Sequence, residues 1–197
     1  MTTDSVRFYD ENADDFFGRT IDVDVTTLYE TFLPKLPPRA RVLDAGCGSG
    51  RDALAFANLG FDVEAIDASS GMVERARVHT GLDVRLLRFE EMDYENEFDG
   101  IWACASLLHV SRQATPLVFQ RFIDALKPGG IWYLSYKYGA DDVVRKGRLF
   151  SSHTEASFED LLRQFPTLRL VEMSTGNDLR TPTERDGWLN AVLRLEE

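Results

Sequence analysis

A glycine-rich segment, Asp44-Ala45-Gly46-Cys47-Gly48-Ser49-Gly50, offers the clearest chemistry in this sequence. It follows a short apolar run at residues 41–45 and precedes a helical pattern at residues 51–59. Glycines let a ligand approach backbone N–H groups closely, and the start of a helix favours such contacts. The segment therefore predicts a ligand-binding turn between a buried strand and a helix. A turn of the same shape without a ligand is the alternative.

Two carboxylates stand where the expected strands end. Asp44 can face the ammonium group of a ligand or order a water beside it. Asp67 follows the second apolar run, residues 61–66, where a carboxylate can accept both hydroxyl hydrogens of a ribose. A solvent-facing acid at a strand end is the alternative for Asp67.

A dinucleotide site is the main rival for this turn. Its fingerprint, G-x-G-x-x-G, requires a third glycine at the position that Arg51 occupies here. Asp44 would also repel a pyrophosphate. An NAD-dependent oxidoreductase is therefore a distant alternative.

Short apolar runs alternate with helical patterns from residue 41 onward, which is typical of a doubly wound α/β fold. We expect a Rossmann-like, seven-stranded, mostly parallel sheet with helices on both faces. A hairpin joining the last two strands would make one strand antiparallel. The expected strands are residues 41–45, 61–66, 84–87, 98–103, 131–136, 168–173 and 188–195.

The expected helices of this core have recognisable boundaries or apolar faces. The third begins at Thr115-Pro116, a good capping pair, and ends at the breaker turn of residues 127–130. The helices are residues 51–59, residues 71–78, the segment that presents Phe119, Phe122, Ile123 and Leu126 on one face, and the segment that presents Phe158, Leu161, Leu162 and Phe165.

The first 40 residues form a section of different character. Residues 10–17 mix acids and aromatics at helical spacing, and residues 26–33 indicate a second short helix that ends at Pro34. We expect one domain over residues 1–197, with residues 1–40 as an N-terminal helical flap and residues 41–197 as the core. The polar stretch at residues 137–152 is a candidate lid or substrate loop.

These features together resemble the class I S-adenosylmethionine (SAM)-dependent methyltransferases, and the resemblance covers nearly the whole chain. The landmarks are the D-x-G-x-G-x-G turn, Asp67 after the second strand, Phe98-Asp99-Gly100-Ile101 at the fourth, and Leu126-Lys127-Pro128-Gly129-Gly130 before the fifth. The resemblance implies SAM as cofactor, with S-adenosylhomocysteine as product.

The resemblance also implies a role for individual positions. Residues 88–92 lack the acid–alanine pair that many family members have there, so Phe89 and Glu90 are the least specific choices. The implied SAM contacts are Asp44, Ala45, Gly46, Cys47, Gly48, Ser49 and Gly50 around the methionine half, Asp67 and Ala68 at the ribose, Met72, Phe89 and Glu90 near the adenine, Ala103, Cys104 and Ala105 beside the methionine portion, and Tyr9 as a cap.

His109 is the best candidate for a catalytic base, although a capping or packing histidine is the alternative because a single histidine is a weak signal. Tyr136, Lys137 and Tyr138 lie near a strand end, where α/β folds bind substrates. Cys47 and Cys104 lack an identifiable base and are interpreted as packing residues rather than nucleophiles.

No His, Cys, Asp or Glu spacing is typical of a metal site, since His79 and His153 stand apart, so we expect no metal. The two cysteines likewise predict neither a disulfide nor structural zinc. The N-terminus lacks the apolar core of a signal peptide, and no apolar stretch approaches the ~20 residues of a membrane span, so we expect a cytoplasmic protein without membrane contact.

A formal charge of −11 disfavours nucleic acid as a partner. An RNA methyltransferase would need a basic tract to bind its substrate. The candidate for such a tract is the cluster of Arg145, Lys146 and Arg148, but a cluster of this size is more typical of a solvated loop. The sequence thus favours a SAM-dependent methyltransferase that acts on a small molecule. A non-catalytic SAM-binding sensor or accessory protein is the alternative, and the oligomeric state stays open.

Overall fold

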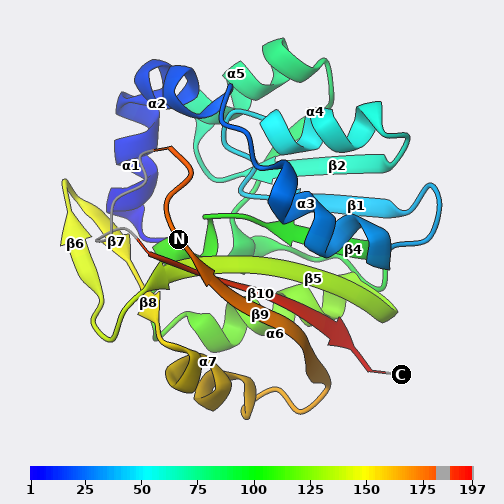
Figure 1. Ribbon diagram of the computed structural model, residues 1–197. Helices are drawn as coiled ribbons and strands as arrows, with labels where there is room; N and C mark the ends of the chain where they lie inside the picture. Colours follow the sequence, from blue (N-terminus) through cyan, green and yellow to red (C-terminus); the bar gives the residue numbers. More distant parts are fainter. Residues whose placement is uncertain (181–186, 197) are drawn as a thin grey trace.

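The protein is built around a twisted sheet with the strand order β3-β2-β1-β4-β5-β10-β9 (Figure 1). The computed structural model describes residues 1–180 and 187–196. Strands β1 to β5 pair in parallel, while β10 runs antiparallel to both of its neighbours. The Rossmann-like, mostly parallel sheet with one antiparallel strand is therefore confirmed. These strands are β1 (Arg41–Ala45), β2 (Asp62–Asp67), β3 (Val84–Leu86), β4 (Phe98–Ala103), β5 (Leu126–Tyr138), β9 (Leu168–Gly176) and β10 (Trp188–Leu195).

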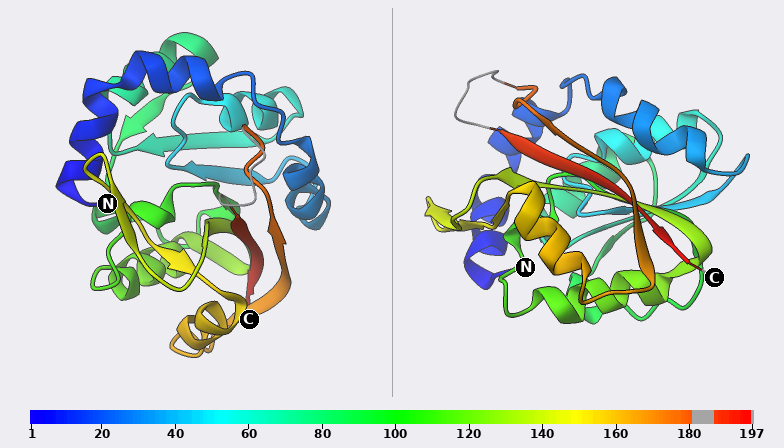
Figure 2. Two further views of the ribbon diagram at one scale, coloured as in Figure 1. Left: turned by 60° about the vertical axis from the view of Figure 1, so that its left-hand side comes forward. Right: turned by 60° about the horizontal axis from the view of Figure 1, so that its bottom comes forward.

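Helices cover both faces of the sheet (Figures 1 and 2). The core helices are α4 (Arg51–Asn58), α5 (Ser70–Thr80), α6 (Thr115–Ala125) and α7 (Glu155–Leu162), with the short 3-10 turns η2 (Phe89–Glu91) and η3 (Leu107–His109). Side chains alternate across β4: Ile101 and Ala103 join the apolar cluster with Phe119 of α6, whereas Trp102 joins the opposite cluster with Phe56 of α4. Each face of the central strands is thus buried under its own helical layer.

The N-terminal flap consists of α1 (Thr3–Glu11), α2 (Ala13–Thr20), α3 (Thr26–Phe32) and the turn η1 (Leu33–Lys35). The helix expected at residues 10–17 is divided, because Asn12 leaves the helical conformation between α1 and α2. Helices α1 and α2 contact α5, and α3 contacts β5. Helices α1 and α2 therefore lie at the edge of the sheet where the glycine-rich turn lies, whereas α3 lies over the face that α4 covers, with Phe32 packed in the cluster of Phe56 and Trp102 (Figures 1 and 2).

The structure differs from the sequence prediction in two further segments. The polar stretch at residues 137–152 contains a hairpin of β6 (Val143–Arg145) and β7 (Arg148–Phe150), and the two-residue strand β8 (Ser152–His153) pairs with the end of β5 and makes the sheet eight-stranded. The turn expected at residues 127–130 belongs to β5, which begins at Leu126 and accommodates Gly129 at a positive φ of 78°. In the connection between β9 and β10, residues 181–186 lie outside the described part of the chain.

Candidate functional site

The glycine-rich turn is fastened to the end of the neighbouring strand. The backbone N–H groups of Gly46 and Cys47 both donate to the carbonyl of Ile66, at 2.9 and 3.0 Å. Gly46, Gly48 and Gly50 adopt positive φ values of 79°, 55° and 78°, which other residues rarely adopt. The turn is therefore a rigid loop with its backbone close to β2, as a ligand cradle requires.

Asp67 links this turn to the next one. One carboxylate oxygen accepts from Gly48 N and the other from Ser69 N, each at 2.9 Å. The residue is 6% exposed, and burial raises the pKa of its carboxyl despite these hydrogen bonds. Each oxygen has further capacity to accept, so Asp67 is built to receive hydroxyl hydrogens beside the turn.

Asp44 presents the opposite situation, a buried carboxylate with an unsatisfied atom. It is 2% exposed, and within the described residues its Oδ2 has no hydrogen-bond partner. Burial, reinforced by the negative charge of Asp52, raises the pKa of its carboxyl well above the ordinary value. A buried acceptor of this kind calls for a donor or a cation from a ligand.

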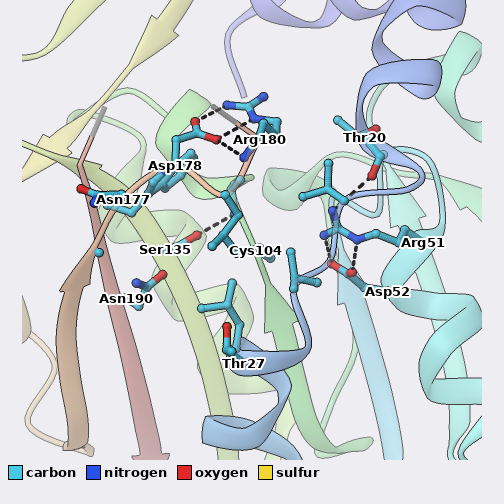
Figure 3. A pocket seen from close by; sticks show the side chains of 18 of the residues that line it. Thr20, Thr27, Arg51, Asp52, Cys104, Ser135, Asn177, Asp178, Arg180 and Asn190 are labelled. Carbon is cyan, nitrogen blue, oxygen red and sulfur yellow. Dashed lines mark hydrogen bonds and ion pairs between the residues drawn. The ribbon is translucent and has the colours of Figure 1, made fainter. Parts of the chain in front are cut away.

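Asp52, in the first turn of α4, is a hub that the sequence analysis missed. Its carboxylate accepts from Tyr29 of α3 at 2.7 Å and from the indole N–H of Trp102 at 2.8 Å. It also accepts from two nitrogens of Arg51, at 2.6 and 3.0 Å, and Arg51 in turn donates to the carbonyl of Thr20 at 3.3 Å. This hub joins the flap, the helix after the turn and the core of the sheet. Figure 3 shows its bonds between Thr20, Arg51 and Asp52.

We expect Asp52→Asn to lower the free energy of unfolding by about 3–5 kcal/mol, because an amide cannot satisfy four donors and leaves the Arg51 charge without its partner. Urea unfolding at neutral pH measures this loss. The matched control is Asp83→Asn, since Asp83 is an exposed carboxylate 4.0 Å from Arg77 and its loss should change little. Equal effects of the two substitutions would contradict the role of the hub.

Tyr9 and His109 connect the flap to the β6–β7 hairpin. The His109 ring bonds the Tyr9 hydroxyl through Nε2 at 2.7 Å and the carbonyl of Leu149 in β7 through Nδ1 at 2.6 Å. Because a carbonyl only accepts, Nδ1 carries the proton and Nε2 accepts from Tyr9. Ser5 of α1 accepts from Leu149 N, and the Arg148 guanidinium lies 4.1 Å from the Phe8 ring centroid. These contacts hold α1 against the β6–β7 hairpin.

Both ring nitrogens of His109 are thus engaged within the protein, and burial lowers the pKa of the ring to about 4. Its role as a catalytic base stays a prediction. The observed contacts give it a fastening role between α1, β7 and η3.

The buried histidine gives stability a pH dependence. The unfolded ring, with its ordinary pKa of 6.5, binds a proton that the folded ring, with a pKa of about 4, does not. Stability that is full above pH 6.5 is therefore lost as pH falls toward 4, by up to about 1.4 kcal/mol per pH unit for this residue. Urea unfolding between pH 7 and 5 should show a shallower decline for His109→Gln than for the wild type. Parallel curves would contradict this origin.

A cavity of about 370 Å³ opens beside the turn. Four parts of the chain line it: the flap, the glycine-rich turn with α4, the ends of β4 and β5, and the region of β9 and β10. The lining residues include Phe16, Val25 and Leu28 on the flap, and Gly46, Cys47, Gly48, Ser49, Arg51 and Asp52 at the turn and α4. They also include Cys104 and Ala105 after β4, Ser135 on β5, and Ser174, Asn177, Asp178, Trp188 and Asn190 around β9 and β10. Figure 3 shows Ser135 of β5, Asn190 of β10 and Asp178, which follows β9, across this space from Arg51 and Asp52. A second cavity, of about 340 Å³, lies at Asp10, Ala68, Leu87 and Arg88, beyond Asp67.

The remaining sequence-predicted residues lie in several different surroundings. Ala68 lies at the second cavity, and Met72 packs with Tyr9 in a small apolar cluster. Buried in the main core are Ala45, Phe89 and Ala103. Outside either cavity, Glu90 pairs with the ammonium of Met1. Cys104 is a cavity residue whose thiol has a pKa raised to about 12 by burial, so it stays protonated.

The three predicted substrate residues alternate in direction along β5. Tyr136 is buried on the opposite face against His153 and Phe158, and Tyr138 is 45% exposed, with its hydroxyl bonded to Glu155. Lys137 faces the cavity side, where its ammonium lies 3.3 Å from Asp178 and 4.1 Å from the Trp188 ring centroid. Ser135, which the sequence analysis did not name, shares that side and lines the cavity.

Metal ligands are not gathered in the part of the chain that the structure describes: residues 1–180 and 187–196 contain no group of three or more His, Cys, Asp or Glu side chains able to hold a metal ion. The same residues form no helix of the length and apolar character needed to cross a membrane.

Comparison with known proteins finds similarity to methyltransferases. Residues 42–130 match a family described as "Methyltransferase domain". A ubiquinone biosynthesis O-methyltransferase of Xanthomonas axonopodis pv. citri is 35% identical over 172 residues, which cover 82% of this chain and 65% of that protein. The chain is thus similar to methyltransferases over residues 42–130 and, in one relative, over 172 residues.

Solved structures share the fold of this chain. The Burkholderia thailandensis 1,6-didemethyltoxoflavin-N1-methyltransferase, with bound 1,6-didemethyltoxoflavin and S-adenosylhomocysteine, superposes with a TM-score of 0.79 at 24% identity and covers 97% of this chain and 87% of its own. The [4+2]-cyclase SpnF superposes with a TM-score of 0.75 at 16% identity, covering 97% and 94%. The chain spans less than two thirds of the length of the curated relatives it matches first, 43% of a Xanthomonas campestris homologue and 65% of the X. axonopodis protein.

Proposed function

We propose that this protein transfers a methyl group from SAM to a small-molecule acceptor. The observation that carries the proposal is the junction of Gly48 and Asp67, a glycine-rich cradle bonded to a buried ribose-type acceptor. This junction lies between the two cavities, one beside the turn and one beyond Asp67. The curated relatives named as O-methyltransferases support the same activity.

The residues present fit SAM. The unsatisfied Oδ2 of Asp44 suits the ammonium end of the methionine half, directly or through a water. Gly48 leaves open space toward the flap, because a Cβ there would meet only Phe16, at 3.6 Å. Asp67 would hold the ribose hydroxyls, and the cavity at Ala68, Leu87 and Arg88 would hold the adenine.

When bound, SAM would supply an electrophilic methyl group whose carbon–sulfur bond breaks as the bond to the acceptor atom forms. The protein's own contribution is to orient the two molecules and to exclude water. Phe16, Val25 and Leu28 of the flap form an apolar wall of the cavity for that purpose. The flap is held closed at one end by Tyr9 and His109 and at the other by Tyr29 and Asp52.

A small acceptor suits this cavity better than a macromolecule. Its volume, about 370 Å³, matches a small-molecule site. The net charge of −11 opposes binding to nucleic acid. Both properties support a metabolite as the acceptor.

Two measurements test the proposal. Calorimetry should detect binding of SAM and of S-adenosylhomocysteine, and SAM labelled in its methyl group should transfer the label to a compound in a metabolite extract. Absence of binding would refute the proposal. Binding without transfer to any metabolite would favour a SAM-binding sensor or accessory protein, and preferential binding of NADH would favour an oxidoreductase.

A further inference from the structure

A row of polar side chains crosses the sheet at the floor of the main cavity. Asn190 of β10 pairs in register with Ser135 of β5 on one side and with Ser174 of β9 on the other. Cys104, directly after β4, continues the row, because Ala103 pairs with Leu134. All four residues line the cavity. Polar side chains at matching positions of adjacent strands form a continuous surface for a ligand.

Two members of the row present hydrogen-bond donors. The Asn190 side-chain oxygen accepts from the Tyr133 hydroxyl at 2.8 Å, which directs its NH₂ group away from that bond. No partner for this NH₂ is found among residues 1–180 and 187–196. The buried Ser135 hydroxyl accepts from Ala105 N at 2.8 Å. Its hydrogen reaches the Cys104 thiol and the Tyr133 hydroxyl, and rotation of the hydroxyl can direct it toward a ligand instead. The floor therefore calls for an acceptor atom on the ligand.

The remaining charges around the cavity are internally balanced. Arg51 is paired with Asp52, and Arg180 with Asp178, at 2.6 Å in each case. Lys137 also contacts Asp178, at 3.3 Å. These pairs leave no carboxylate of the cavity lining, within the described residues, without a cationic partner. A ligand amine would thus face hydrogen-bond donors and carboxylates that are already paired. A neutral or anionic ligand oxygen could instead accept hydrogen bonds from those donors.

We infer that Ser135 and Asn190 form the recognition site for the methyl acceptor and that they select a phenol-type molecule by donating hydrogen bonds to its oxygen atoms. This inference rests on the proposed function. The apolar walls at Val25, Leu28 and Trp188 suit the ring of such a molecule, since small-molecule sites combine apolar walls with a few placed polar groups. The relatives named as O-methyltransferases agree with an oxygen-bearing acceptor.

The test measures binding of three ring compounds to the protein saturated with S-adenosylhomocysteine, by calorimetry or saturation-transfer NMR. The probes are catechol, which offers phenolic oxygens, toluene, which offers none, and benzylamine, which is a cation. We expect catechol to bind best. Ser135→Ala should weaken catechol roughly five- to ten-fold by removing one donor. The control is Ser151→Ala, because Ser151 is a buried serine that bonds Val110 and lies outside the cavity lining.

Asn190→Asp gives the sharper result. The carboxylate keeps an acceptor for Tyr133 but replaces the NH₂ donors with an anionic oxygen, so catechol should weaken by more than roughly ten-fold and benzylamine should gain affinity. A purely structural role for Asn190 would not invert the preference. Equal binding of catechol and toluene, or unchanged probe binding in both variants, would overturn the inference. Binding of S-adenosylhomocysteine is measured in the same samples, and its loss in the wild type would instead overturn the proposed function.

Discussion

Asp67→Asn is expected to weaken binding of S-adenosylhomocysteine by about 100-fold or more, the largest effect of any single polar substitution at this site. The two carboxylate oxygens accept from Gly48 N and Ser69 N, so an amide places its NH₂ group against one of these donors. The substitution therefore disturbs the turn and removes a ribose acceptor together. Calorimetric titration measures the loss.

The matched control for Asp67 is Asp62→Asn. Asp62 lies at the other end of β2 and is exposed, so its substitution removes the same charge without touching the turn. Its affinity for S-adenosylhomocysteine should stay within about three-fold of the wild type. If Asp67→Asn behaved like this control, Asp67 would not be a cofactor residue.

Gly46→Ala is expected to remove cofactor binding and to lower the free energy of unfolding by about 2–5 kcal/mol, from backbone strain and overpacking together. Gly46 has a φ of 79°, and an added Cβ would lie 2.4 Å from the Cβ of Ser106. Ser106 has little room to move, since it is buried and its hydroxyl donates to the carbonyl of Ala45 at 2.7 Å. Urea unfolding and calorimetry measure the two effects.

Gly60→Ala separates the two causes. Gly60 has a similar φ of 89°, but nothing lies within 4 Å of the added Cβ, so only the strain of about 1 kcal/mol remains. An equal loss of stability at Gly46 and Gly60 would show that contact with Ser106 contributes nothing.

Local sequence patterns predicted the sheet and its central turn well. The apolar runs of β1, β2 and β4 are bounded by glycine and aspartate, and the D-x-G-x-G-x-G spacing follows directly from the backbone geometry that the turn needs. The approach of Asp67 to Gly48 also follows, because parallel strands that neighbour one another end at the same edge of the sheet.

Contacts that join distant segments could not be predicted in the same way. Tyr29 and Trp102 reach Asp52 from α3 and β4, and no local periodicity links these positions. On β5, both faces are buried, so the sequence lacks the alternation that would have told Ser135 from Tyr136. The Ser135–Asn190 pair depends on the register of β5 with β10, which only the assembled sheet defines.

The positions of the tryptophans allow intrinsic fluorescence to report ligand binding. Trp102 and Trp132 are fully buried within the two apolar layers, whereas the half-buried Trp188 lines the main cavity beneath the Lys137 ammonium. Indole emission responds to the polarity of its surroundings, so a ligand that enters this cavity changes the emission of Trp188 directly, whereas the indoles of Trp102 and Trp132 lie outside the cavity lining. A fluorescence titration can therefore follow occupancy of the acceptor side before any acceptor has been identified.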